Sequence, residues 1–297
     1  MDKILVLLAT YNGEKYLREQ LDSIYGQEGV DVAVLVRDDN SSDGTIKILN
    51  EYKNRKMLEW YTGDHLNVQK GYYNLMKKAS KMDYQYFAFS DQDDVWDKDK
   101  LRIGVDAIKG KAIPALYYCG QRLVDENLKF IANHELNKKR SFLTRFVLSD
   151  FAGCTGVFNI ELLHEVVKFE PEYMLMHDTW ILKVCLCLGG TVTVDPGIHI
   201  SYRQHGGNTV GLGRSIFAYL KQVNQYMNEY QVERQIRELV RGYGNRMISP
   251  YKEMSDWICN YRNNKMYKKY LLNRDNVDFC KKGLNLVYTL KICTNKL

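Results

Sequence analysis

The sequence predicts an α/β fold, a doubly wound and mostly parallel sheet with helices on both faces. Residues 3–9 (KILVLLA) form a continuous apolar run, which is typical of a parallel strand buried on both faces. Strand and helix patterns then alternate at intervals of about 25–35 residues, which favours right-handed crossovers between neighbouring strands. The 297 residues, 45% hydrophobic and 26% charged, suffice for one large domain or two smaller ones.

The elements follow from local patterns along the chain. Strands are expected at 3–9, 30–36, 58–61, 86–89, 116–119, 191–194 and 198–202, and residues 151–158 are expected to form a glycine-containing loop and a strand. Helices are expected at 16–25, 46–52, 71–80, from 101 onward, 141–148, 160–167 and 180–188, and again from Ile216 onward. Asp97 and Asp99 are expected to cap the helix that begins at Leu101.

Three polar clusters follow the ends of predicted strands. They are Thr10–Gly13, Asp38–Asp39 and Asp91–Asp94. Because ligands of such sheets bind beyond the carboxyl ends of the strands, we expect the three clusters to converge on one crevice.

The third cluster predicts a cation. The first turn, TYNG, lacks the glycine-rich pattern that cradles phosphates through backbone amides. A divalent cation held by carboxylates neutralises a diphosphate instead. In Asp91-Gln92-Asp93 the two carboxylates point the same way if the segment is extended. The alternative is a plain turn with capping aspartates, and no role is assigned to Asp94.

Four segments carry a resemblance to a known family. ATYNGEKYLREQLDSI, RDDNSSDGT, FSDQDDVWDKDK and HDTW, in this order, resemble family 2 glycosyltransferases of the GT-A fold. FSDQDDVW with a later YRQHGGN is similar to the rhamnosyltransferase-like branch that builds bacterial cell-surface polysaccharides. The resemblance implies a GT-A domain over 1–212, with a nucleotide-sugar half (1–110) and an acceptor half (111–212). A basic helical extension over 213–297 would follow.

The resemblance assigns residues to the donor nucleotide. Thr10, Tyr11, Asn12 and Asp39 match the positions that hold the base and ribose. Asp39 would accept a hydrogen bond from the base imide, and Tyr11 would lie along the ring. Lys70, in a loop expected to face the crevice, would contact phosphate or base, or remain solvated.

The resemblance also assigns the metal and the catalytic base. Asp91 would bind the ribose and Asp93 would bind Mn²⁺ or Mg²⁺. His205 matches either a further metal ligand or a phosphate contact. Asp178 matches the catalytic base, although the residue before it is His177 where the family more often has Glu.

Four further residues near this set also have expected roles. Trp180 is expected either to stack on an acceptor sugar or to pack in the core, and His177 is placed with the acceptor. Arg203 is a candidate for neutralising phosphate. Asn40 stands where the family more often has Gly, and Asn tolerates a left-handed backbone.

The expected activity is an inverting, metal-dependent transfer of a sugar, such as rhamnose or another hexose, from a UDP- or dTDP-sugar to a glycan or lipid-linked glycan. One alternative is a sugar nucleotidyltransferase, which would need a glycine-rich basic first loop; TYNGEK offers only Lys15. Another is a catalytically silent nucleotide-binding assembly protein, against which the complete set of aspartates argues.

Charge and cysteine content bear on location and partners. Residues 214–297 hold 16 Lys/Arg and 7 Asp/Glu, a net charge of +9, whereas the rest carries −3. This tail is a solvated face, an oligomer interface or a contact with an anionic membrane; no nucleic-acid partner is expected.

Seven scattered cysteines, with Cys185 and Cys187 expected in the core, favour the cytoplasm. A signal peptide is not expected, and the inner face of the plasma membrane is a candidate location.

Overall fold

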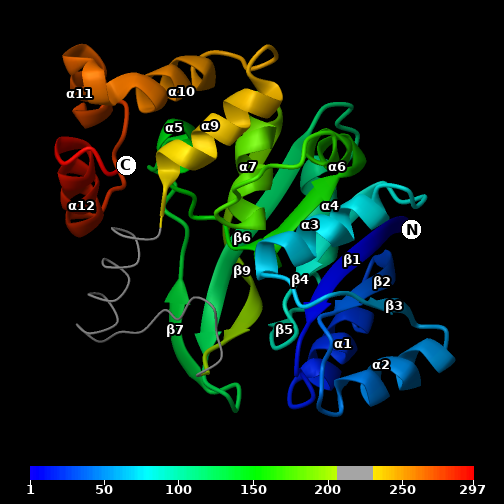
Figure 1. Ribbon diagram of the computed structural model, residues 1–297. Coiled ribbons are helices and arrows are strands. Elements are labelled where there is room, and N and C mark those ends of the chain that lie inside the picture. Colours follow the sequence, from blue (N-terminus) through cyan, green and yellow to red (C-terminus); the bar gives the residue numbers. More distant parts are fainter. Residues whose placement is uncertain (206–229) are drawn as a thin grey trace.

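A mixed sheet of nine strands organises the part of the chain that the computed structural model describes, residues 1–205 and 230–297 (Figure 1). The strands are β1 Asp2–Thr10, β2 Val30–Asp38, β3 Leu58–Thr62, β4 Tyr86–Ser90, β5 Val95–Trp96, β6 Ala115–Val124, β7 Phe130–His134, β8 Gly156–Asn159 and β9 Thr191–Arg203. The helices are α1 Leu17–Tyr25, α2 Thr45–Asn54, α3 Val68–Ala79, α4 Lys100–Ile108, α5 Phe142–Val147, α6 Ile160–Val167, α7 His177–Cys187, α9 Val232–Tyr243, α10 Tyr251–Asn260, α11 Lys265–Leu272 and α12 Lys282–Cys293. Short 3₁₀ turns lie at η1 Gly153–Thr155 and η2 Tyr261–Asn263. The expected domain boundary at 212/213 and the helical start at Ile216 lie outside the described residues.

The predicted parallel sheet is confirmed in the first half. The strand order is β3-β2-β1-β4, and every pairing in it is parallel. Thr10 is level with Asp38, and Leu8 is level with Ser90. The polar residues that follow β1, β2 and β4 therefore leave the sheet at one edge.

The second half extends the sheet in a mixed pattern. β8 pairs antiparallel with both β4 and β6, while β9 runs parallel to β6. The two strands expected at 191–194 and 198–202 are one strand, β9, whose register on β6 shifts near Gly120. The sequence pattern breaks at Pro196 and Gly197, but β6 continues to pair on both sides of the irregularity. The strand β7, an edge strand on β6, was not expected.

Apolar cores flank the sheet on both faces, as the continuous apolar run of β1 predicts. Ile4, Val6 and Leu8 pack with α1, α2 and α4. Leu5 and Leu7 point to the opposite face and pack with α3, α6 and α7. Successive strand residues point to opposite faces, so a strand covered on both sides is apolar throughout.

The C-terminal helices continue the second of these cores. Buried side chains of α9 to α12 belong to the same apolar cluster as α7, and Figure 1 shows α9 and α10 beside α7 and α5. Backbone contacts tie them further: Ile248 N–H donates to the Cys187 carbonyl at 2.9 Å, and Asp278 N–H donates to the Thr144 hydroxyl at 3.0 Å. Within the described residues no helix combines the length and the apolarity that crossing a bilayer requires.

Candidate active site

Gln92 joins the turn after β1 to the loop after β4. Its Oε1 accepts hydrogen bonds from the Thr10 hydroxyl at 2.6 Å and from Tyr11 N–H at 2.9 Å, and its Nε2 donates to the Tyr11 carbonyl at 3.2 Å. A Cβ on Gly13 would overlap the Gln92 amide, so this approach requires glycine. The Tyr11 ring is 47% exposed and lies 4.6 Å from the His65 ring.

Two asparagines shape the adjoining turns. Asn12 and Asn40 have φ angles of 48° and 64°, in the left-handed region that Asn tolerates, which confirms the expectation for Asn40. The Asn12 Oδ1 accepts from Ser42 N–H at 2.8 Å, and Asn12 N–H donates to the Ser41 hydroxyl at 2.9 Å. In this conformation Asn12 links the turns after β1 and β2.

Asp39, directly after β2, is held in an ion pair. Its carboxylate contacts the guanidinium of Arg37, which is buried. A Cβ on Gly71 would come within 3.8 Å of Asp39 Oδ2, so the first turn of α3 lies against this pair. Lys70, in that turn, has an exposed side chain. Its N–H donates to the side chain of Asn67, the N-cap of α3.

Asp91 lies between Tyr72 and Cys154. The Tyr72 hydroxyl is 3.0 Å from Asp91 Oδ1 and 2.7 Å from the Ser90 carbonyl. Burial, and then the charge of Asp93, raise the pKa of Asp91 to about 7. Oxygens of Asp91 and Asp94 and the Cys154 sulfur all lie within 4.8 Å of one another.

Asp93 faces His205, and the neighbouring Asp94 points inward. Asp93 Oδ2 lies 2.6 Å from His205 Nε2, so strand β9 brings the histidine to the loop after β4. Asp94 is fully buried and its Oδ1 accepts from Arg203 N–H at 3.2 Å. Burial raises its pKa well above the usual value. Asp94 therefore anchors the loop from within.

Arg203 is a structural residue, which corrects its expected role at a phosphate. The side chain is 1% exposed. Its Nε donates to the Asp93 carbonyl at 2.7 Å, and its Nη2 pairs with the Glu19 carboxylate at 2.5 Å. The guanidinium also lies over the Tyr16 ring. These contacts fix the loop after β4 against α1.

Asp178 lies in the first turn of α7 and faces the turn η1. Its Oδ2 accepts from Gly153 N–H at 3.0 Å, and its Oδ1 accepts from Thr179 N–H at 2.5 Å. These bonds favour the ionised carboxylate, but the cost of burying its charge is larger and raises its pKa to about 6. A carboxylate with this pKa is ionised at neutral pH and accepts a proton more readily than a free aspartate.

His177 and Trp180 point away from solvent, which corrects their assignment to the acceptor. Trp180 is fully buried and packs near Phe169 and Tyr243. The His177 ring is 3% exposed and stacks on Tyr72 at 3.8 Å. Burial lowers its pKa to about 3, so the ring is neutral. Core packing, the other option for Trp180, is what the structure shows.

Other expected side-chain roles differ in detail. Asp97 does not cap α4; it pairs with Arg122, at 3.1 Å. Asp99 is at the N-cap position but makes no capping hydrogen bond. Cys185 and Cys187 are buried, as expected.

Sequence reasoning gave no role to Gln92 or Tyr72 and did not single out Lys100. Gln92 lies between two aspartates, and its side chain points opposite to theirs in an extended segment, which is the signal that the sequence offers for its separate role. Tyr72 is the residue that connects Asp91 to His177, and the sequence predicts only that it lies in a helix. Lys100 is fully buried with its ammonium 3.6 Å from the Trp96 ring, and burial lowers its pKa to about 8.

Asp93 and His205 fit a divalent cation. They offer a carboxylate oxygen and an imidazole nitrogen that already face each other. Oxygen ligands suit Mg²⁺ and Mn²⁺, and phosphate oxygens and water complete such sites. Asp94 is too deeply buried to share a cation with a diphosphate.

The sheet is parallel in its first half, and carboxylates gather beyond the carboxyl ends of those strands, which is typical of an α/β enzyme that binds its ligand there. The sequence model described as "Glycosyl transferase family 2" matches residues 5–167, more than half of the chain. The protein belongs to this family and is a glycosyltransferase.

Individual relatives agree with this result. The dTDP-rhamnosyl transferase RfbG of Shigella flexneri is 29% identical over 241 residues, covering 75% of this chain and 80% of RfbG. This confirms the resemblance to the rhamnosyltransferase-like branch. The putative teichuronic acid biosynthesis glycosyltransferase TuaG of Bacillus subtilis is 32% identical over 99 residues, 33% of this chain and 38% of TuaG.

Solved structures confirm the GT-A fold class. Residues 1–349 of S. aureus TarS, in complex with UDP-GlcNAc, superpose with a TM-score of 0.62 at 17% identity. That match covers 99% of this chain and 82% of TarS 1–349. The mannosyltransferase PcManGT from Pyrobaculum calidifontis, in complex with GDP-Man and Mn²⁺, gives a TM-score of 0.55 at 14% identity, covering 99% and 86% of the two chains.

Proposed function

We propose that this glycosyltransferase moves a sugar, with inversion at the anomeric carbon, from a UDP- or dTDP-sugar to a glycan or lipid-linked glycan. The observation that carries the proposal is that carboxylates from two separate parts of the chain meet, Asp178 of α7 and the pair Asp91 and Asp93 of the loop after β4. Asp178 accepts from the N–H of Gly153, and Cys154, the next residue, lies within 4.8 Å of Asp91. Asp91 is two residues from Asp93, which faces His205.

The donor nucleotide is proposed to bind at the edge formed by β1, β2 and β4. Asp39 has a second carboxylate oxygen to accept from a base imide, and its charge is stabilised by Arg37. Tyr11, with half of its ring exposed, offers a flat surface for the base. Asp91 would accept from a ribose hydroxyl, and Lys70 would reach the base or a phosphate. Uracil and thymine share the imide, so this site accepts either base.

Asp93 and His205 are the proposed ligands of Mn²⁺ or Mg²⁺. When bound, the cation would stabilise the negative charge of the diphosphate leaving group. Other residues of this chain hold the two proposed ligands in position whether or not a cation is bound. Arg203 holds the Asp93 backbone in place through the carbonyl, and β9 delivers His205.

Asp178 is proposed to be the catalytic base. The acceptor hydroxyl transfers its proton to the Asp178 carboxylate while its oxygen forms a bond to the anomeric carbon. The bond from that carbon to the diphosphate oxygen breaks, and its electron pair leaves with the nucleoside diphosphate. One base opposite the leaving group gives a single displacement, which inverts the anomeric configuration.

The acceptor is proposed to belong to cell-surface polysaccharide synthesis. RfbG transfers rhamnose from a dTDP donor, by its description, and TuaG is described as acting in teichuronic acid biosynthesis. These relatives favour rhamnose or another hexose as the transferred sugar. We further propose that the reaction takes place in the cytoplasm, at the inner face of the plasma membrane. A sugar nucleotidyltransferase is disfavoured because Lys15, the basic residue of the first turn, pairs with Glu126 at the surface, at 2.8 Å.

A thermal-shift screen of nucleotide sugars, with and without Mn²⁺, tests the donor assignment. A cognate donor at about 100 times its dissociation constant stabilises the fold by about 2.7 kcal/mol through mass action. We expect a UDP- or dTDP-sugar to raise the melting temperature more when Mn²⁺ is present. Equal shifts with and without the metal, or no shift with any of these donors, would contradict the proposal. Release of nucleotide from the best donor then separates an active enzyme from a silent assembly protein.

A further inference from the structure

The surface formed by α11 and α12 concentrates unneutralised positive charge. Residues 265–297 hold 8 of the 42 Lys/Arg and 2 of the 36 Asp/Glu of the chain. The other residues, with 34 of each, carry no net formal charge. The net charge of +6 is therefore that of these two helices and their flanking segments.

The lysines of this surface differ from the arginines of the neighbouring helix α9. Arg237 and Arg241 of α9, and Arg246 shortly after it, each form ion pairs with glutamates, at 2.8 Å in the pair of Arg237 with Glu233. By contrast, Lys265, Lys268, Lys269, Lys281 and Lys282 form no ion pair with any described residue. Their charge is available to an external partner.

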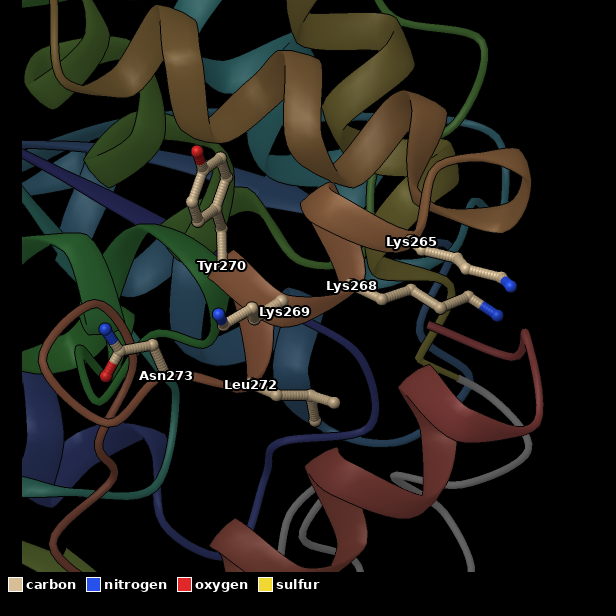
Figure 2. A pocket seen from close by; sticks show the side chains of 6 residues that line it. All are labelled: Lys265, Lys268, Lys269, Tyr270, Leu272 and Asn273. Atoms are coloured by element: carbon tan, nitrogen blue, oxygen red, sulfur yellow. The ribbon is translucent and has the colours of Figure 1, made fainter.

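Three of these lysines surround a hollow on α11. A cavity of about 670 Å³ is lined by Lys265, Lys268, Lys269, Tyr270, Leu272 and Asn273. Figure 2 shows Lys265 and Lys268 extending in the same direction from the helix, with Leu272 one turn further along. Lysine side chains beside Leu272 suit an anionic headgroup that lies above apolar surface.

Apolar side chains are exposed on the same two helices. On α12, Lys282, Leu286, Leu290 and Cys293 follow the spacing of one helical face and are exposed, Leu286 at 61% and Leu290 at 47%. The opposite face of α12 is buried through Tyr288 and its neighbours. On α11, Met266 is 53% exposed.

We propose that the α11–α12 surface binds an anionic phospholipid membrane and holds the enzyme at the bilayer. Lysines attract the anionic headgroups, and Leu286 and Leu290 reach the boundary of the acyl chains. A nucleic acid would leave these leucines in water. A second copy of the chain would bring two surfaces of the same positive charge together. This inference concerns attachment and does not depend on the proposed transfer reaction.

Co-sedimentation of the full-length protein with vesicles tests the proposal. The vesicles contain phosphatidylcholine alone, or with about 30% phosphatidylglycerol. One variant reverses three lysines, Lys265→Glu, Lys268→Glu and Lys269→Glu; its charge-matched control is Lys47→Glu, Lys53→Glu and Lys81→Glu, at exposed sites on α2 and after α3. A third variant carries Leu286→Ser and Leu290→Ser. Thermal melts establish that each variant is folded.

We expect wild type and the control to bind the anionic vesicles and to dissociate at high salt. Each lysine near an anionic surface contributes a factor of about five, so the α11 reversal should weaken partitioning at least ~100-fold. The leucine variant should also bind more weakly. Equal binding to neutral vesicles, equal loss in the control, or no binding by wild type would overturn the proposal. Light scattering that shows a dimer lost in the leucine variant would assign the surface to a second copy instead.

Discussion

Replacing Asp178 by Asn tests the proposed base most directly. The change keeps the size of the side chain and removes its capacity to accept a proton. Asp178 contacts the N–H groups of Gly153 and Thr179 and makes no hydrogen bond to Asp39 or Asp93. We therefore expect sugar transfer to be lost while nucleotide binding is retained.

The size of the effect follows from the contacts of this carboxylate. A positioned base contributes about 10²–10⁴-fold, so we expect kcat to fall by that factor. Burial raises the pKa from 3.8 to about 6, a cost of roughly 3 kcal/mol for the ionised form in the folded state. Asn removes this cost but leaves one of two backbone N–H groups without an acceptor, which costs about 1–3 kcal/mol. The cost of the buried charge that Asn removes and the cost of the unpaired N–H group that it adds nearly cancel at neutral pH. The variant should therefore fold and melt within about 5 °C of wild type.

The same pKa sets the dependence on pH. The group must be ionised to act as a base, so kcat/KM of the wild type should fall as pH drops through about 6. Because the folded pKa lies above the unfolded one, Asp178 stabilises the fold when protonated, fully so below 3.8. This stabilisation is lost as pH rises through about 6. The melting temperature of wild type relative to Asp178→Asn should therefore be highest in acid.

The assay measures release of nucleoside diphosphate from purified enzyme with donor, acceptor and Mn²⁺ across this pH range. Asp106→Asn is the matched control, because Asp106 is an exposed aspartate on α4 that pairs only loosely with Arg102. A folded Asp178→Asn enzyme that keeps more than about a tenth of wild-type kcat would refute the assignment. So would unchanged kcat with weakened donor binding.

Three further substitutions probe other parts of the site. Asp93→Ala should abolish the effect of Mn²⁺ on UDP or dTDP binding, because it removes the carboxylate that faces His205; an unchanged metal response in calorimetry would defeat that claim. Gln92→Ala should lower the melting temperature by several degrees and weaken nucleotide binding, since it removes hydrogen bonds to Thr10 and Tyr11 worth about 0.5–1.5 kcal/mol each; thermal melts and calorimetry measure both. Trp180→Phe should destabilise the fold by about 1–3 kcal/mol without changing the acceptor KM, because the indole is buried; a raised KM at unchanged stability would restore its role at the acceptor.

The parallel strands and the acidic cluster after β4 could be predicted from local patterns. A strand covered on both faces must be apolar along its length, and β1 and β4 show this directly. The carboxyl ends of parallel strands leave the sheet on the same side, so the polar residues after them had to gather. These inferences need only the chemistry of each segment and the topology of the sheet.

Local sequence patterns could not predict the orientation of α7. Its residues are buried nearly all round, from Thr179 to Cys187. A helix that is apolar on every side has no amphipathic stripe to show which face meets the site. Trp180 is therefore equally suited by sequence to an acceptor or to the core, and His177 is assigned by sequence to the acceptor. Only the packing of Tyr72 against His177 and of Tyr243 against Trp180 decides.

The role of Arg203 likewise depends on residues distant in sequence. Its partners, Glu19 and the Asp93 carbonyl, are 184 and 110 residues away. Local sequence does not distinguish an arginine that contacts a phosphate from an arginine that holds the loop beneath the phosphate site. Local chemistry places Asp39, Asp91 and Asp93 of this enzyme, because each follows a recognisable strand. The burial of the side chains around them is decided by long-range packing, because burial is a property of the neighbours that the fold brings together.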